Sequence, residues 1–214
     1  MPDKSNLSRI ESFSDGVFAI ALTLLVIDLK EPPLRDNHSV AEVWFSLKNL
    51  GPAFFAFLLS FGIILISWVN HHSVLMLVDK TSPKFVYANG LLLLTIVFMP
   101  FPTAFLAEYI WTDLAAPAVV LYSFVNLMQS VAWTIMMRSA VYPVPLCKNE
   151  HSKSVLKETY RISFYAIFVY AGCTVVAFWF PQVIAMIITF IWIMWLFWGL
   201  HFKESQPRKI NVKM

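Results

Sequence analysis

The feature that most constrains the fold is a stretch from Ile162 to Phe202 that contains no Asp, Glu, Lys or Arg. A continuous helix over this stretch would measure about 60 Å, roughly twice the thickness of a membrane's hydrocarbon core. Pro181 lies near its middle and lacks the backbone N–H that a continuing helix needs. The sequence therefore predicts two membrane-spanning helices that form a tight hairpin at Phe180, Pro181 and Gln182.

Four further apolar stretches precede this hairpin, and most charged residues lie between the stretches. Only 14% of the chain is charged, against about a quarter in a typical soluble domain. Because every backbone polar group in lipid needs a partner within the protein, such stretches form helices. We predict an all-α integral membrane protein whose residues 1–214 form one domain of six transmembrane helices. The first four spans are Phe13–Leu29, Leu50–Asn70, Phe85–Ala107 and Leu114–Met137.

Lys and Arg residues are distributed unevenly between the two ends of the predicted bundle. With a cytoplasmic N-terminus, 13 of the 16 lie on the cytoplasmic side, and only Lys30, Arg35 and Lys48 lie outside. This excess predicts that both termini are cytoplasmic. The basic loop from Arg138 to Arg161 is interpreted as a determinant of this topology, with binding of anionic lipid as a secondary role. The net charge of +3 is too small to indicate a nucleic-acid partner.

The first span is unusual because it carries an aspartate, Asp15, about one turn inside an apolar helix. Such a residue is costly in lipid unless it faces protein or water, so it marks a structural or functional position. At about 100° per residue, Ile20, Leu24 and Ile27 share one stripe flanked by Thr23, and Asp15 lies about 140° away. If the aspartate points into the subunit, the stripe faces a symmetry partner or a pore.

Three segments carry a more specific pattern of polar and aromatic residues. They are Arg9, Phe13, Ser14 and Asp15 with Phe18–Ile20 and Thr23–Leu25; Trp68–His72; and Asn89–Leu94 followed by Pro100–Thr103. Together these segments resemble the signature of the transmembrane protein 175 family. Its members are potassium channels of animal endosomes and lysosomes, with shorter prokaryotic relatives. Animal members carry two six-helix repeats in each chain, whereas this chain has one, and its last three spans match only in hydropathy.

The resemblance implies a homotetramer in a prokaryotic cell membrane, with the first helices of four subunits lining a potassium pore. Bulky residues matching Ile20, Leu24 and Ile27 would form its constriction, and Thr23 would supply a hydroxyl layer associated with selectivity. The expected partners are other copies of the chain, potassium ions and membrane lipid, and no cofactor is expected besides the permeant K⁺. The resemblance also implies a structural network outside the ion path, made of Arg9, Phe13, Ser14, Asp15, Trp68, His71, His72 and Asn89.

Several of these residues keep a second interpretation. Asp28 either attracts cations at the outer mouth of the pore or is a solvated helix end. Asp15 alone would fit a proton relay. The adjacent His71 and His72 favour pH modulation over a metal site, because neighbouring helical residues point about 100° apart. Pro100 is predicted to bend the third span near the outer leaflet.

Rival functions remain. A proton-coupled secondary transporter is the main alternative, and it would need a polar site near the membrane midplane. The only mid-span polar group of that kind is Asn126, Gln129 and Ser130 in the fourth span. Proton permeation through the same pore also stays open. An enzyme is not expected, because the cluster of Asp15 and the two histidines lacks a nucleophile. A carbonyl filter is excluded, since no Thr-Val-Gly-Tyr-Gly segment is present.

Overall fold

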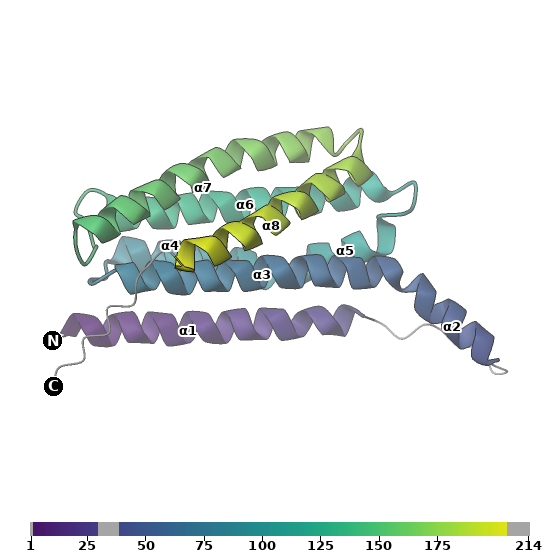
Figure 1. Cartoon of the computed structure of the whole chain (residues 1–214), viewed down its shortest axis with the longest axis horizontal. Coiled ribbons are helices and arrows are strands. Elements are labelled where there is room, and N and C mark those ends of the chain that lie inside the picture. Colours follow the sequence, from purple (N-terminus) through teal and green to yellow (C-terminus); the bar gives the residue numbers. More distant parts are fainter. Residues whose placement is uncertain (1, 30–38, 205–214) are drawn as a thin grey trace.

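The computed structural model describes residues 2–29 and 39–204, and its regular elements in this part of the chain are all helices. Figure 1 shows α1, α3, α4, α6 and α7 running lengthwise side by side, while α8 crosses them obliquely. The prediction of an all-α protein is thus confirmed. The elements are α1 (Pro2–Leu24), the 3₁₀ helix η1 (Leu25–Asp28), α2 (Val40–Asn49), α3 (Gly51–Leu77), α4 (Pro83–Phe98), α5 (Pro100–Tyr109), α6 (Ala115–Val141), α7 (Glu150–Val176) and α8 (Pro181–Glu204).

Among the described residues, five helical segments are long and apolar enough to cross a membrane. A sixth apolar segment, Pro181–Leu196, is shorter than these five. The fifth segment begins well before the predicted Ile162, because the side chain of Asn149 caps the helix by accepting a hydrogen bond from the Ser152 amide. The structure therefore supports a membrane protein with at least five spans. The five segments are Asn6–Ile27, Gly51–Leu77, Pro83–Tyr109, Ala115–Val141 and Glu150–Val176.

Prolines interrupt the helices at both predicted places. The long uncharged stretch breaks between the end of α7 at Val176 and Pro181, the first residue of α8, as the hairpin prediction required. The third predicted span divides at Met99 into α4 and α5, because Pro100 begins the second piece without a backbone N–H to continue the first. The bend predicted at Pro100 is present.

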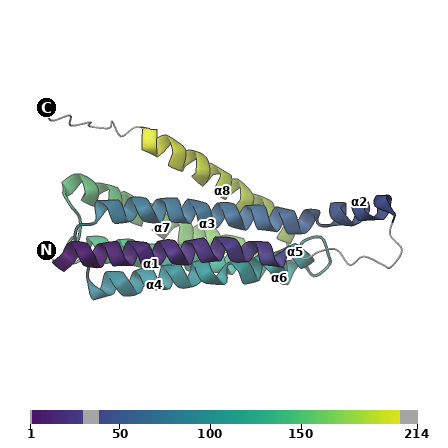
Figure 2. The same cartoon turned by 90° about the horizontal axis from the view of Figure 1, so that it is seen from below.

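The helix α2 lies between the first two predicted spans, where no helix was predicted. It forms because Ser39 and Glu42 build a reciprocal capping box. The Ser39 hydroxyl accepts from the Glu42 amide at 3.2 Å, and the Ser39 amide donates to the Glu42 carboxylate at 3.1 Å. Figures 1 and 2 show α2 projecting beyond the end of α3, where none of its residues is buried.

Apolar packing holds α1 against the rest of the bundle. Phe18 and Ala21 of α1, with Leu25 of η1, which directly continues α1, belong to one buried cluster that also contains Ile63 of α3 and Ile96 of α4. In soluble proteins the hydrophobic effect drives helices together. In lipid, close packing and interhelical hydrogen bonds supply this attraction instead. The face of α1 that carries these three residues is therefore its attachment to the subunit.

Polar side chains inside the bundle bond to one another. The Tyr122 hydroxyl lies 2.9 Å from the Ser60 hydroxyl, which accepts from Thr103 at 2.6 Å. Gln129 donates its amide N–H to the Ser67 hydroxyl at 2.7 Å. These bonds tie α3 to α5 and α6 at depths where an unpaired polar group is expensive.

Candidate functional site

The first helix has one face turned into the subunit. Ser14, Phe18, Ala21 and Leu25 are all buried, and their spacing of three or four residues places them on one side of α1. This side contacts both α3 and α4. The adjoining sides of α1 are partly covered, since Glu11 and Asp15 also contact α3.

The opposite face of α1 is uncovered in the single chain. Ile20 is 59% exposed and Ile27 is 67% exposed, and Thr23 and Leu24 are exposed between them. The Thr23 hydroxyl donates to the Ile20 carbonyl at 2.8 Å, which leaves its oxygen lone pairs free to accept. The structure thus brings the four predicted pore residues onto one apolar stripe that carries a single hydroxyl.

Asp15 lies away from this stripe, between α1 and α3. The Trp68 indole N–H donates to its carboxylate at 2.8 Å. One turn earlier, Glu11 lies 3.2 Å from the Nδ1 of His72. The two pairs form an antiparallel ladder, since Glu11 and Asp15 are four residues apart on α1 and their partners are four apart on α3.

Glu11 was missed in the sequence analysis. Its spacing from Asp15 was the available clue, because residues four apart on a helix share a face. An antiparallel neighbouring helix that places Trp68 beside Asp15 also places His72, which lies one turn farther along it, beside Glu11.

Ser14, Asn89 and His71 form a second, fully buried set. Asn89 donates its amide N–H to the Ser14 hydroxyl at 3.1 Å, and its carbonyl oxygen lies 2.7 Å from the Nε2 of His71. With that oxygen as acceptor, the network assigns the imidazole proton to Nε2. Nδ1 of His71 has no hydrogen-bond partner among the residues that the structure describes, and the ring packs near Phe18 and Trp133.

Two predicted network residues lie elsewhere. Phe13 is 66% exposed, and Arg9 is exposed without a hydrogen bond or ion pair to any described residue. Arg9 precedes Ile20 by eleven residues, or about three turns, so it lies on the uncovered stripe rather than beside Asp15. Their place in the network stays a prediction, because within one chain they do not reach it. Asp28 ends η1, but its side chain falls outside the described residues.

No group of three or more His, Cys, Asp or Glu residues in the described part of the chain is arranged to hold a metal ion. His71 and His72 point to different partners, Asn89 and Glu11. The site is therefore best described as an apolar face on α1 with a hydrogen-bonded support behind it.

Comparison with known proteins matches the part of the chain that contains this site. Residues 9–100 match the family described as the endosomal/lysosomal potassium channel TMEM175. A potassium channel of Chamaesiphon minutus is 41% identical over 163 residues, which are 75% of this chain and 80% of that protein. An endosomal/lysosomal proton channel TMEM175 of Gallus gallus is 32% identical over 148 residues, covering 63% of this chain and 30% of the relative.

The solved structures agree with the sequence comparison. The crystal structure of a lysosomal potassium-selective channel TMEM175 homolog from Chamaesiphon minutus superposes with a TM-score of 0.79 at 33% identity. The superposition covers 91% of this chain and 98% of that one. The chain is therefore an integral membrane protein that belongs to the TMEM175 family of potassium channels.

Proposed function

We propose that the chain is one subunit of a homotetrameric, potassium-selective channel whose pore is lined by α1. The observation that carries the proposal is the division of α1 into a buried face and an apolar stripe that the subunit leaves uncovered. Four copies of this stripe around a common axis would supply rings of Ile20, Leu24 and Ile27. Rings of such side chains act as a hydrophobic constriction that gates by dewetting.

The polar residues on the stripe favour a pore over contact with lipid. Arg9 lies in line with Ile20, and Thr23 carries the hydroxyl nearest to the bulky residues. An arginine facing acyl chains is costly, whereas a water-filled vestibule would hydrate it. The weaker hydration of K⁺ relative to Na⁺ would favour its passage through the apolar rings, and Thr23 would replace part of the lost water.

Asp15 has a structural role in this proposal. Its carboxylate accepts from Trp68 on the side of α1 away from the stripe. The residue therefore orients α1 on α3 and does not contact the permeating ion.

A secondary transporter fits the buried polar residues less well. Asn126 donates to the Tyr122 carbonyl and accepts from the Trp192 indole, while Gln129 is bonded to Ser67. Apart from the Gln129 Oε1, which has no partner among the described residues, the polar groups of these two side chains are thus engaged within the chain instead of converging on a substrate site near the midplane.

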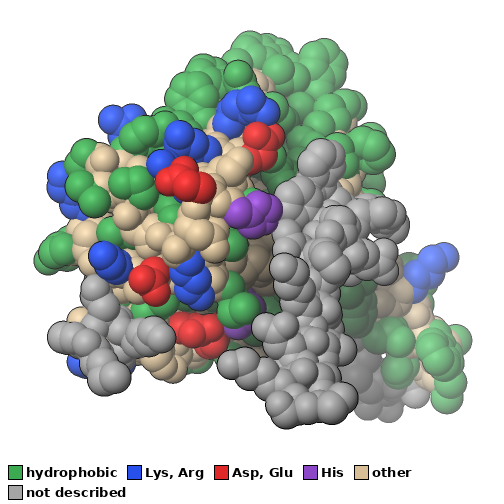
Figure 3. All heavy atoms as spheres, turned by 60° about the vertical axis from the view of Figure 1, so that its left-hand side comes forward, with side chains coloured by type: hydrophobic (Ala, Val, Ile, Leu, Met, Phe, Trp, Pro, Cys, Tyr) green, Lys and Arg blue, Asp and Glu red, His purple; other side chains and the backbone are tan. Residues whose placement is uncertain are grey.

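The proposed topology has six spans, including α8, with both termini in the cytoplasm of a prokaryotic cell. Figure 3 looks at the end of the bundle where α1 begins, and Lys and Arg side chains gather over it. Lys84 at the start of α4 and Arg138 near the end of α6 belong to this end. Such an accumulation marks the cytoplasmic side.

Labelling of Cys147 tests this orientation. Cys147 lies in the loop between α6 and α7, and the other cysteine, Cys173, is buried in α7. A membrane-impermeant maleimide should fail to label Cys147 in intact cells and should label it after permeabilisation. Burial raises the pKa of the Cys147 thiol, so the labelling rate should increase as the pH is raised and the reactive thiolate forms.

A cysteine at the opposite end provides the control. Asp113→Cys in a Cys147→Ser, Cys173→Ser background places an exposed thiol in the loop between α5 and α6. It should be labelled in intact cells. Labelling of Cys147 itself in intact cells would reverse the proposed orientation.

The conduction proposal is tested in a planar bilayer with K⁺ on one side and Na⁺ on the other. The purified protein should give unitary currents whose reversal potential is displaced far from zero in the direction set by a permeability to K⁺ greater than that to Na⁺. A carrier would give no unitary currents, and reversal near zero would contradict selectivity. Proton permeation is measured with a pH gradient at symmetrical K⁺. This second measurement is relevant because the relative from Gallus gallus is named a proton channel.

A further inference from the structure

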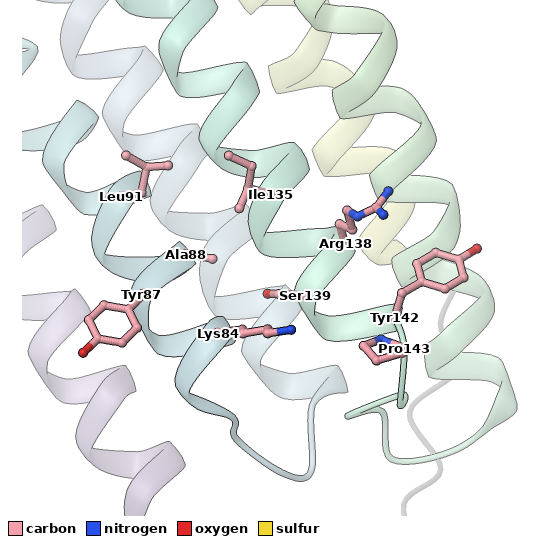
Figure 4. Close-up of a pocket in the computed structure, with 9 residues that line it drawn as sticks. All are labelled: Lys84, Tyr87, Ala88, Leu91, Ile135, Arg138, Ser139, Tyr142 and Pro143. Carbon is pink, nitrogen blue, oxygen red and sulfur yellow. The ribbon is translucent and has the colours of Figure 1, made fainter.

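A groove between α4 and α6 is not used by the proposed pore. It has a volume of about 590 Å³ and lies where α4 begins and α6 ends. Figure 4 shows Lys84 reaching from α4 toward Ser139 on α6, while Arg138 and Tyr142 line the same groove with side chains directed away from Lys84. The groove therefore combines two cations with hydroxyl groups at one end of the bundle.

The two cations in the groove have no acidic partner. Neither Lys84 nor Arg138 forms an ion pair or side-chain hydrogen bond with any residue that the structure describes. Nearby on α7, Lys153 pairs with Glu150 and Arg161 pairs with Glu158. The groove thus presents unneutralised positive charge, whereas these cations of the same basic region are neutralised within the chain.

The other half of the groove is apolar. Leu91 follows Lys84 by two turns along α4, and Ile135 precedes Arg138 by about one turn along α6. Because α4 and α6 are antiparallel, both apolar residues lie on the side toward the middle of the bundle. A ligand that fills the groove must therefore carry an anionic group at one end and a hydrocarbon chain at the other.

We propose that this groove binds an anionic phospholipid, with its phosphate between Lys84 and Arg138 and an acyl chain along Leu91 and Ile135. Basic pockets between transmembrane helices on the cytoplasmic side bind anionic headgroups of this kind. The hydroxyl of Ser139, which lies beside Lys84, would donate to a remaining phosphate oxygen. The assignment to the cytoplasmic leaflet rests on the proposed topology, but the chemistry of the groove does not.

Native mass spectrometry of the purified full chain tests the proposal with phosphatidylglycerol and phosphatidylcholine as probes. The double variant Lys84→Gln, Arg138→Gln should bind phosphatidylglycerol roughly thirtyfold more weakly, since each basic residue near a membrane surface contributes about 1 kcal/mol. Its affinity for phosphatidylcholine should not change. Both side chains are exposed, so the melting temperature of the variant should match that of the parent protein.

A second double variant, Lys80→Gln, Lys157→Gln, removes the same charge from exposed positions at this end of the molecule that do not line the groove. It should retain phosphatidylglycerol binding. Equal losses in the two double variants would show a general charge effect and overturn the proposal, as would unchanged binding in the groove variant. Displacement of the lipid by inorganic phosphate alone would assign the site to free phosphate instead.

Discussion

Replacing Ile20 with asparagine is expected to raise the single-channel potassium conductance about tenfold, because a barrier lowered by about 1.4 kcal/mol gives that factor. Ile20 is 59% exposed at the centre of the uncovered stripe on α1. In a tetramer, four amide side chains would replace four butyl groups at one of the three apolar rings of the constriction. Water would then wet the constriction, and a hydrated cation would cross it with less loss of hydration. The measurement is unitary current in symmetrical K⁺.

Leu94→Asn is the matched control for this experiment. Leu94 is 64% exposed on α4, and α4 places Asn89 beside Ser14, so Leu94 lies at about the depth of Ile20. The same polar group at that position should leave the conductance unchanged. Equal currents for both variants and the parent protein would remove Ile20 from the pore.

Replacing Asn89 with leucine is expected to destabilise the protein by about 2 kcal/mol, which corresponds to roughly 6 °C in melting temperature. The change removes the donor to Ser14 and the acceptor for His71, and both of these residues are fully buried. The two polar groups would then lie in the bundle without partners. Thermal unfolding in detergent, followed by size-exclusion chromatography, measures the effect.

Asn70→Leu serves as its control. Asn70 lies on α3, immediately before His71, but it is only half-buried and its side chain forms no hydrogen bond with a described residue. Its replacement should change the stability by less than about 0.5 kcal/mol. Similar melting temperatures for the two variants would mean that the buried set around Asn89 does not hold α1 to α4.

The helices and the division of α1 into faces could be predicted because both depend on local sequence. The uncharged stretch around Pro181 had to fold back, and the chain does turn between Val176 and Pro181, although α8 crosses the bundle obliquely instead of packing along α7. The separation of Asp15 from Ile20 followed from helical geometry alone, and the structure places them on different sides.

The contacts between helices were harder to predict, because they depend on the register of one helix against another. Trp68 and Asn89 could be associated with Asp15 and Ser14 only through the family resemblance. Glu11 was missed because its partner, His72, becomes a neighbour only once α1 and α3 are aligned. Arg9 lies on the uncovered stripe of α1 within one chain, so its place in the network stays a prediction that rests on the motif alone.

Cysteine scanning along α1 in a Cys147→Ser, Cys173→Ser background tests the central claim most directly. Each single-cysteine channel would be exposed to a cationic thiol reagent during recording in a planar bilayer. We predict that modification at Ile20, Thr23, Leu24 and Ile27 reduces the potassium current, whereas Phe18, Ala21 and Leu25 give no change. A current insensitive to modification at the four stripe positions, or sensitive at the three buried positions instead, would contradict a pore lined by α1.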